Sequence, residues 1–141
     1  MADLRARLYG VCLLFGTACS ASLPTPLPAR QPRSAYRPVP YPPPAAFAEV
    51  VPRTPAPDAL WVDGHWAWRG GKFVWQRGGW VIAPEGARFA HWRLLYSQDG
   101  TLQFAEDTWY DAHLLPMRRP KTIAPALTPP NAMTPEAKHA P

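Results

Sequence analysis

Side chains that could bind a metal ion or transfer a proton are few in this chain of 141 residues, which has four histidines. Asp63 and His65 are two residues apart, so on a β-strand they would lie on the same face. His91 and His113 are far from them in the sequence. A zinc site needs three or four converging ligands, and this spacing offers no such group. We therefore predict no metal site and no cofactor.

The candidates for catalysis are equally weak. Glu106, Asp107 and Asp111 are close enough in the sequence to supply paired carboxylates, but acidic residues near a strand end more often form a solvated rim. No Gly-x-Ser-x-Gly motif is present for a nucleophilic serine, and no glycine-rich loop is present that could hold a phosphate. We predict no catalytic residue and expect that the chain is not an enzyme.

Tryptophan is the residue that gives the chain its pattern. Five of the seven tryptophans fall within residues 61–80, WVDGHWAWRGGKFVWQRGGW. This stretch contains Trp-x-x-Gly-x-Trp twice, first as Trp61, Gly64 and Trp66 and again as Trp75, Gly78 and Trp80. An indole ring is flat and apolar with one N–H donor, so it can fill a core or offer a stacking surface to a sugar or an aromatic partner. The four tryptophans of the motif are therefore candidate binding residues.

The two copies are joined by Gly70-Gly71, which is a two-residue turn signal because both turn positions need a positive φ. A hairpin centred on this turn pairs aromatic residues across its strands: Trp68 with Phe73, Trp66 with Trp75, and Trp61 with Trp80. Each cross-strand aromatic pair stabilises a sheet by about 0.2–1 kcal/mol. A rival arrangement makes Asp63-Gly64 the turn and pairs Trp61 with Trp66. We prefer the longer hairpin because it forms three aromatic pairs at once.

The spacing of the tryptophans raises a difficulty for a straight strand. Trp61 and Trp66 are an odd number of residues apart, so they would lie on opposite faces. Gly64 and Gly78 lie between the paired tryptophans on the two strands, and glycine inside a strand often marks a bulge. A bulge would bring both tryptophan pairs to one face. We therefore expect Gly64 and Gly78 to be structural glycines, with a φ that only glycine adopts easily.

A second hairpin is predicted around Asp99-Gly100. As a two-residue turn, it pairs Leu95 with Phe104 and Arg93 with Glu106. A degenerate third copy of the tryptophan motif follows, at Phe104, Asp107 and Trp109.

Together the hairpins predict an all-β domain over residues 58–115. We expect a small antiparallel meander of about four strands, either open or curled into a partial barrel, with strands near 60–68, 73–82, 88–97 and 101–110. The only cysteines, Cys12 and Cys19, lie outside this domain, so no disulfide can hold it. Tryptophan compensates, since each ring can bury about 150–250 Å².

The segments on either side are rich in proline. Residues 20–57 contain 12 of the 20 prolines and four arginines but a single acidic residue, and seven prolines lie within 116–141. Because such compositions cannot bury a core, we predict a disordered linker over 19–57 and a disordered tail over 116–141. The linker is either a passive spacer or an electrostatic tether to an anionic surface. The whole chain has a net charge of +5, but residues 58–115 carry seven acidic and five basic side chains, so a nucleic-acid-binding face is not expected.

Residues 1–18 have the pattern of a signal peptide, with arginines ahead of an apolar run that is too short to cross a bilayer permanently. The run ends in Gly-Thr-Ala-Cys19, which resembles a bacterial lipobox. This resemblance implies that Cys19 is lipidated and becomes the mature N-terminus. It also implies an outer-membrane address, because Ser20 and not aspartate follows. The alternatives are a plain secretory signal cleaved after Ala18 and an uncleaved anchor.

The tryptophan motifs carry a second resemblance. Residues 59–82 resemble the tryptophan- and glycine-rich repeat of bacterial envelope proteins, written YxWxxGxW or WxxGxW. The tyrosine of that repeat is replaced by Ala59 in the first copy and by Phe73 in the second. Proteins with this repeat are commonly small secreted or lipid-anchored envelope proteins of unknown biochemical function. The resemblance therefore implies a location better than it implies an activity.

Two functions are compatible with these observations. The first is a non-enzymatic cell-envelope lipoprotein that faces the periplasm, whose domain is a structural or assembly module in contact with another envelope protein. The alternative is a cell-wall glycan-binding module that holds peptidoglycan on exposed tryptophans. We predict that at least one of Trp66, Trp75 and Trp80 presents substantial ring surface and marks the contact site, as the alternative requires.

Overall fold

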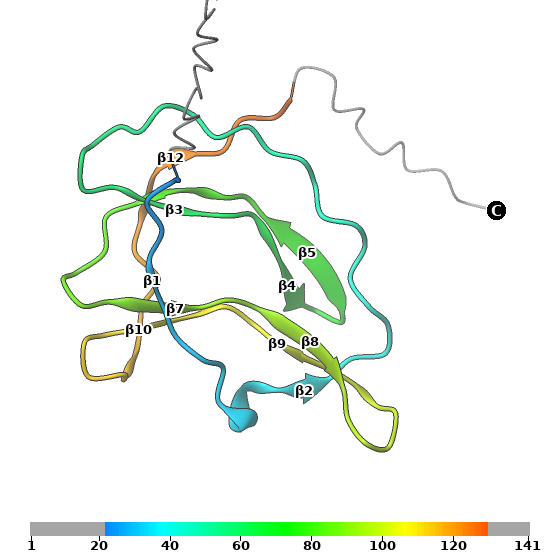
Figure 1. Cartoon of the computed structure of the whole chain (residues 1–141). Helices are drawn as coiled ribbons and strands as arrows, with labels where there is room; N and C mark the ends of the chain where they lie inside the picture. The colour runs from blue at the N-terminus through cyan, green and yellow to red at the C-terminus, as the bar shows by residue number, and fades with distance from the viewer. Residues whose placement is uncertain (1–21, 130–141) are drawn as a thin grey trace, which may run out of the picture.

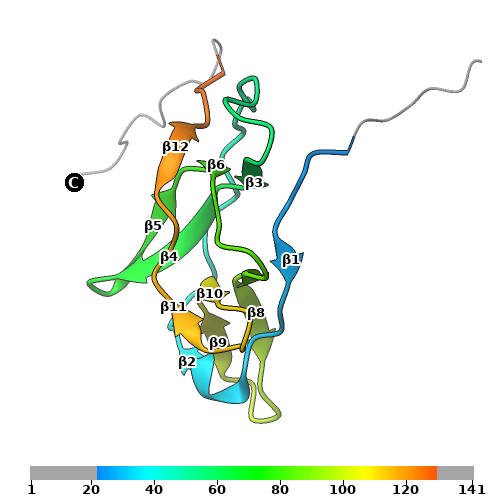
Figure 2. The ribbon, with the colours of Figure 1, turned by 90° about the vertical axis from the view of Figure 1, so that its left-hand side faces the viewer.

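The computed structural model describes residues 22–129, which form an all-β fold, as predicted, built around two long hairpins (Figure 1). The first hairpin contains β3 (Leu60–Val62), β4 (His65–Arg69), β5 (Lys72–Gln76) and β6 (Gly79–Val81). The second hairpin contains β7 (Arg88–Ala90), β8 (Arg93–Tyr96), β9 (Leu102–Ala105) and β10 (Thr108–Tyr110). The strands belong to four small sheets and not to one continuous meander. Figure 2 shows the first hairpin stacked on the second.

The first hairpin has the predicted register. Gly70 and Gly71 form its turn with φ of 55° and 80°, as a two-residue turn of this kind requires. Trp66 faces Trp75 and Trp68 faces Phe73 in the β4–β5 ladder, and Trp61 faces Trp80 in the β3–β6 ladder. The rival arrangement with a turn at Asp63-Gly64 is therefore wrong.

Both strands of the first hairpin are interrupted at the same level, by residues 63–64 on one side and 77–78 on the other. Because two residues leave the ladder on each side, the register continues unchanged across the break. Both tryptophan pairs contact the same covering segment: Phe47 packs on Trp66, and Val51 packs on the Trp61 cluster. A symmetric break of two residues on each strand thus restores the phase of the two pairs, where the sequence led us to expect bulges at Gly64 and Gly78.

The second hairpin is shifted by one residue from the predicted register. Its strands pair Leu94 with Phe104 and Arg93 with Ala105, because the loop has three residues, 98–100, and not two. Gly100 takes the left-handed position of that loop, with φ of 81°. The Ser97 hydroxyl and the Thr101 N–H donate hydrogen bonds to the Asp99 carboxylate and lower its pKa to about 2. The Asp-Gly signal was read correctly as a hairpin, but it did not decide the loop length.

A break also interrupts the second hairpin, at residues 91–92 and 106–107. The β7–β10 ladder pairs Phe89 with Trp109 in the register of the β8–β9 ladder, so this hairpin too continues across its break. Phe104, Asp107 and Trp109, the predicted third copy of the motif, therefore occupy the same places as Trp75, Gly78 and Trp80 in the first hairpin. The two hairpins are structural equivalents.

The core lies between the hairpins in two parts. Val62 and Val81 of the first hairpin pack against Phe89 and Trp109 of the second. At the turn ends, Leu102 and Phe104 of the second hairpin pack with Trp68 and Phe73 of the first, and the Phe73 and Phe104 rings are 5.1 Å apart. The inner face of each hairpin thus covers that of the other.

The predicted disordered linker, 19–57, is ordered over its described part, 22–57. It contains β1 (Leu27–Pro28), the 3₁₀ helix η1 (Arg33–Ala35) and β2 (Arg37–Pro38). β1 adds to β7 in parallel and β2 adds to β9 in antiparallel. Proline lacks an N–H, so composition argued against strands, but it is tolerated in short edge strands such as these, and its restricted φ lowers the entropy lost on docking.

The predicted disordered tail, 116–141, is also ordered over its described part, 116–129. β11 (Pro116–Met117) pairs with β10, and β12 (Thr122–Pro125) pairs with β6. These strands cover edges that the hairpins alone would leave open. The folded unit therefore extends on both sides of the predicted 58–115. Cys19 and the predicted signal peptide lie outside the described residues. Within 22–129, no helix has the length and apolar character needed to cross a membrane.

Candidate functional site

The outer side of the first hairpin is covered by a proline-rich segment, residues 39–57, which we call the strap. It leaves β2, passes around the outside of the first hairpin and returns into β3 (Figure 1). The Tyr41 ring lies 5.5 Å from Trp68, and the Phe47 ring lies 5.4 Å from Trp66 and 5.3 Å from Trp75. The tryptophan-rich stretch and the predicted linker therefore form one surface together.

The first tryptophan pair of the motif is buried under the end of the strap. Trp61 and Trp80 are 3% and 2% exposed, and their rings meet edge to face at 5.4 Å. The Trp61 indole N–H donates to the Asp63 carboxylate at 2.7 Å, and that of Trp80 donates to the Pro52 carbonyl at 2.9 Å. Both indoles have their hydrogen-bonding capacity satisfied inside the fold, so neither offers a donor to a ligand.

The second pair is covered less completely. Trp66 is 5% exposed, and its indole N–H has no hydrogen-bond partner among the described residues. Trp75 is partly buried, with Phe47 against its face. The glycan-binding alternative needed a substantial exposed ring at Trp66, Trp75 or Trp80. Trp66 and Trp80 do not meet that condition, and Trp75 is partly buried with Phe47 of the strap packed on it.

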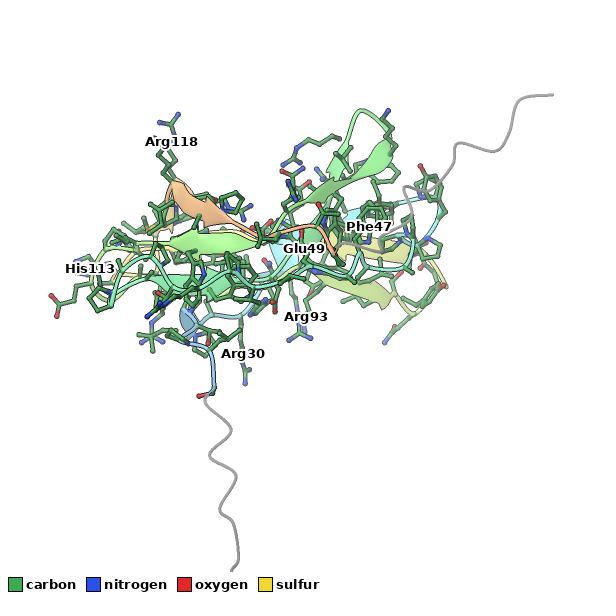
Figure 3. The ribbon with its side chains drawn as sticks, turned by 90° about the horizontal axis from the view of Figure 1, so that it is seen from above. Arg30, Phe47, Glu49, Arg93, His113 and Arg118 are labelled. Atoms are coloured by element: carbon green, nitrogen blue, oxygen red, sulfur yellow. The ribbon has the colours of Figure 1, made fainter. Side chains whose placement is uncertain are left out.

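A carboxylate of the strap binds the centre of the repeat. Glu49 accepts a hydrogen bond from the Trp75 indole N–H at 3.0 Å and another from the Gly78 backbone N–H at 2.9 Å. Each oxygen of the carboxylate thus has its own donor. Figure 3 shows Glu49 and Phe47 close together on this side of the molecule.

The motif glycines make room for that carboxylate. A Cβ at Gly64 would lie 2.5 Å from Glu49 Oε2 and 2.4 Å from Trp75 Cζ2, and a Cβ at Gly78 would lie 2.8 Å from Glu49 Oε2 and 2.7 Å from the Gly64 nitrogen. Neither glycine has a positive φ, unlike Gly70 and Gly71. The expected bulge conformation at Gly64 and Gly78 is therefore wrong: these positions need glycine for close approach and not for φ.

The break in the second hairpin is filled by a different side chain of the N-terminal segment. The Gln31 amide nitrogen donates to the backbone carbonyls of Ala90 at 3.1 Å and His91 at 2.9 Å, and also to that of Glu106. These carbonyls come from both sides of the break. Gln31 thus stabilises the second break as Glu49 stabilises the first.

Sequence reasoning missed both Glu49 and Gln31. One signal was available, since Glu49 is the single acidic residue between 20 and 57. A segment with four arginines does not need one acidic side chain to stay soluble. A single glutamate in it therefore favours a specific contact. Nothing distinguishes Gln31 in the sequence.

A buried acid–base group connects the hairpins to the C-terminal segment. His65, which is 3% exposed, places Nε2 2.9 Å from Asp107 Oδ1 and Nδ1 3.3 Å from the Asp63 carbonyl. Arg119 lies 3.8 Å from the other Asp107 oxygen. Burial raises the pKa of Asp107, but the hydrogen bond and charge of His65 and the charge of Arg119 outweigh it, so its pKa lies below the ordinary value. Both imidazole nitrogens lie within hydrogen-bond distance of groups of the fold: Asp107 and Arg119 at Nε2, and the Asp63 carbonyl at Nδ1.

The other acid of the second break, Glu106, joins three elements. Its carboxylate accepts from Arg69 Nη1 at 2.6 and 2.8 Å, from the Trp68 backbone N–H at 3.2 Å, and from Arg37. The predicted pairing of Glu106 with Arg93 is wrong, because the one-residue shift of the register turns each side chain to the other face. Glu106 instead holds β2 and the first hairpin against the second.

A cavity of about 640 Å³ lies apart from the tryptophan motifs, next to β1 and β7. Arg30 and Arg88 line it together with apolar side chains that include Tyr110 and Leu114. A smaller one of about 210 Å³ includes His65 and Asp107. Within residues 22–129, no three His, Cys, Asp or Glu side chains are grouped so that they could hold a metal ion.

The comparisons with known proteins agree with this geometry in one respect. The WXXGXW repeat family matches residues 60–81, in two copies, which are the four strands of the first hairpin and its break. No curated protein and no solved structure matches the chain. The resemblance read from the sequence is thereby confirmed for the repeat: residues 60–81 carry two copies of the WXXGXW repeat, and these copies are the two strands of one interrupted hairpin.

Proposed function

We propose that this protein is a non-enzymatic cell-envelope lipoprotein whose domain serves as a structural or protein-interaction module. The observation that carries the proposal is the burial of the repeat tryptophans: three of the four motif rings are at most 5% exposed, and the fourth, Trp75, is partly buried against Phe47 of the strap. Rings used in this way stabilise a small domain that has no disulfide.

The envelope location rests on sequence features. The repeat is typical of small envelope proteins, and the segment that ends in Cys19 resembles a lipobox. A lipid on Cys19 would place the domain close to a membrane surface, because few residues separate Cys19 from the first described residue, Ser22. Partners that such a module would meet are other envelope proteins and peptidoglycan.

Membrane attachment is tested by fractionation. Cys19→Ala should move the protein from the membrane and detergent fractions to the soluble fraction, because one lipid-bearing residue supplies the attachment. Cys12→Ala is the matched control, since it removes the other cysteine of the chain and should leave fractionation unchanged. A Cys19→Ala protein that still follows the membrane as wild type does would contradict lipidation at this residue.

The choice between a structural and a glycan-binding role is tested on the tryptophans. Single Ala substitutions of Trp61, Trp66, Trp75 and Trp80 should each lower the melting temperature, while the variants that stay folded keep the wild-type retention on peptidoglycan. Tyr96→Ala, at a ring that is 70% exposed, is the control for surface effects. A tryptophan variant that keeps its melting temperature and loses retention would favour the glycan-binding role instead.

A further inference from the structure

We infer that the WXXGXW repeat of this protein forms a receptor site for an extended peptide with an aromatic residue two positions before a glutamate, and that the strap fills this site within the same chain. The inference goes beyond the proposed function and does not depend on the lipid anchor or the cellular location. It rests on the contacts of Phe47 and Glu49.

The glutamate subsite has the chemistry of a carboxylate receptor. One oxygen is bound by an indole N–H and the other by a backbone N–H, at 3.0 and 2.9 Å. Hydrogen bonds to an ionised acceptor are about twice as strong as neutral ones. Gly64 and Gly78 leave space for the carboxylate against the backbone, where any side chain would enter its volume. Three residues of the motif, Gly64, Trp75 and Gly78, therefore surround this carboxylate.

The aromatic subsite lies beside it on the same pair of tryptophans. The Phe47 ring meets Trp75 edge to face at 5.3 Å and Trp66 in a tilted arrangement at 5.4 Å. It remains 46% exposed, so it lies on the surface of the hairpin as a ligand does and not within the core. Residues 47 and 49 project to the same side of an extended chain, which explains the spacing of the two contacts.

A backbone contact fixes the direction of the segment. Val50 and Leu127 exchange two hydrogen bonds of 2.9 Å, N–H to carbonyl in both directions. Recognition of an extended peptide by main-chain bonds together with pockets for alternate side chains is a recurring mode of binding.

The strap is attached in a way that allows it to be replaced. Among the described residues, no backbone–backbone hydrogen bond involves positions 40–49, so this part is held by side chains, chiefly Tyr41, Phe47 and Glu49. Its prolines favour an extended conformation before docking, which reduces the entropy lost on binding. A segment attached in this way can open locally while the hairpins stay folded.

The test uses the full chain and a labelled peptide of residues 45–53, AAFAEVVPR. In the double variant Phe47→Ala/Glu49→Gln the internal ligand is impaired, and the peptide should bind at least tenfold more tightly than it binds wild type, whose site is occupied at high effective concentration. A peptide with glutamine in place of its glutamate should bind at least tenfold more weakly to the double variant, because the charged acceptor is lost. Glu85→Gln, which alters an exposed glutamate, should leave peptide binding as weak as in wild type.

Two results would overturn the inference: no peptide binding by a double variant that keeps the wild-type circular dichroism, or equal binding of the glutamate and glutamine peptides. If the double variant does not fold, Glu49→Gln alone is measured by NMR. The Gly78 amide and Trp75 indole proton resonances should then shift while the Trp61 indole resonance stays in place. Unchanged Gly78 and Trp75 resonances would show that the carboxylate is not bound there.

Discussion

The two hairpins are built alike but their breaks are closed by opposite chemistry. In the first hairpin, Gly64 and Gly78 leave the backbone open, and the Gly78 N–H takes a carboxylate acceptor from the strap. In the second hairpin, Trp92 and Asp107 stand at the equivalent places, and the exposed groups are carbonyls, which take the amide donor of Gln31. A break in a long hairpin thus does not need the WXXGXW motif.

What the motif decides is the kind of group that the break admits. With glycine on both strands, an ionised side chain can approach the backbone and an indole N–H together. With side chains present, the acids of the break bind neighbouring elements: Asp107 pairs with His65, and Glu106 pairs with Arg37 and Arg69. The first hairpin thus binds one carboxylate from outside, Glu49, whereas the second contributes two of its own, Glu106 and Asp107. Both closing side chains come from the proline-rich N-terminal segment, which explains why that segment is ordered.

The largest expected effect tests whether the hairpins contribute equally to the core. Trp80→Ala in the first hairpin and Trp109→Ala in the second should each lower the free energy of unfolding by about 3–5 kcal/mol, since both rings are only 2% exposed. Urea denaturation followed by circular dichroism measures this, and Tyr96→Ala should stay within about 0.5 kcal/mol of wild type. A large loss for only one of the two tryptophans would mean that the hairpins are not energetic equivalents.

The next effect concerns the equivalent break positions. Gly78→Ala should cost about 1–3 kcal/mol, because the added Cβ would lie 2.7 Å from the Gly64 nitrogen and 2.8 Å from the Val62 carbonyl oxygen. Gly71→Asn is the control, since nothing lies within 4 Å of a Cβ there and asparagine tolerates a left-handed φ. If Gly78→Ala is as stable as wild type, the difference between the two breaks is not one of space.

Exchanging the chemistry of Glu49 and Gln31, the side chains that close the two breaks, tests whether each break selects a donor or an acceptor. Glu49→Gln brings an amide donor toward the Gly78 N–H, and Gln31→Glu brings a carboxylate toward three carbonyls. Each should cost about 1–2 kcal/mol, because a partly buried polar group is left without its partner. Urea denaturation is again the measurement, with Glu85→Gln as the neutral control. Stability that is unaffected by either exchange would show that the breaks do not discriminate donors from acceptors.

The smallest effect is a change in acid sensitivity at the second break. The pKa of Asp107 is lowered in the folded state, so its contribution to stability is present above the unfolded value of about 3.9 and is lost as the pH falls through the folded pKa. The free energy of unfolding of Asp107→Asn should therefore depend less on pH below about pH 4 than that of wild type. Asp58→Asn, at an exposed aspartate, should not. If the stability of Asp107→Asn below about pH 4 depends on pH as that of wild type does, the lowered pKa of Asp107 is contradicted.

The first hairpin could be predicted from the sequence because its information is local. Gly70-Gly71 fixes the turn, and the aromatic pairs leave one register in which all of them meet. The second hairpin was predicted less well, since Asp99-Gly100 suits a two-residue turn and also the end of a three-residue loop. The interactions that decide between them include the Ser97 and Thr101 hydrogen bonds, which a list of turn signals does not contain.

The sequence predicted the tryptophans of the candidate site but not the segment that covers them. Trp61, Trp66, Trp75 and Trp80 were identified and paired correctly, but their burial depends on a segment that composition assigned to disorder. Proline content reports that a segment cannot build its own core; it does not report that a neighbouring surface complements it. The contacts of Phe47 and Glu49 join residues more than fifteen positions apart, beyond the reach of periodicity or turn chemistry.

The closing of both breaks by the N-terminal segment sets an order of folding. Gln31 and Glu49 are synthesised before either hairpin, yet Gln31 binds carbonyls from both strands of the second hairpin, which come together only when β7 meets β10. Glu49 binds Trp75 and Gly78 of one strand, and its carboxylate also lies against Gly64 of the other strand, which reaches this place only when β3 meets β6. Local hairpins form faster than contacts that close long loops. We therefore expect the N-terminal segment, although it is synthesised first, to stay undocked until the two hairpins have formed.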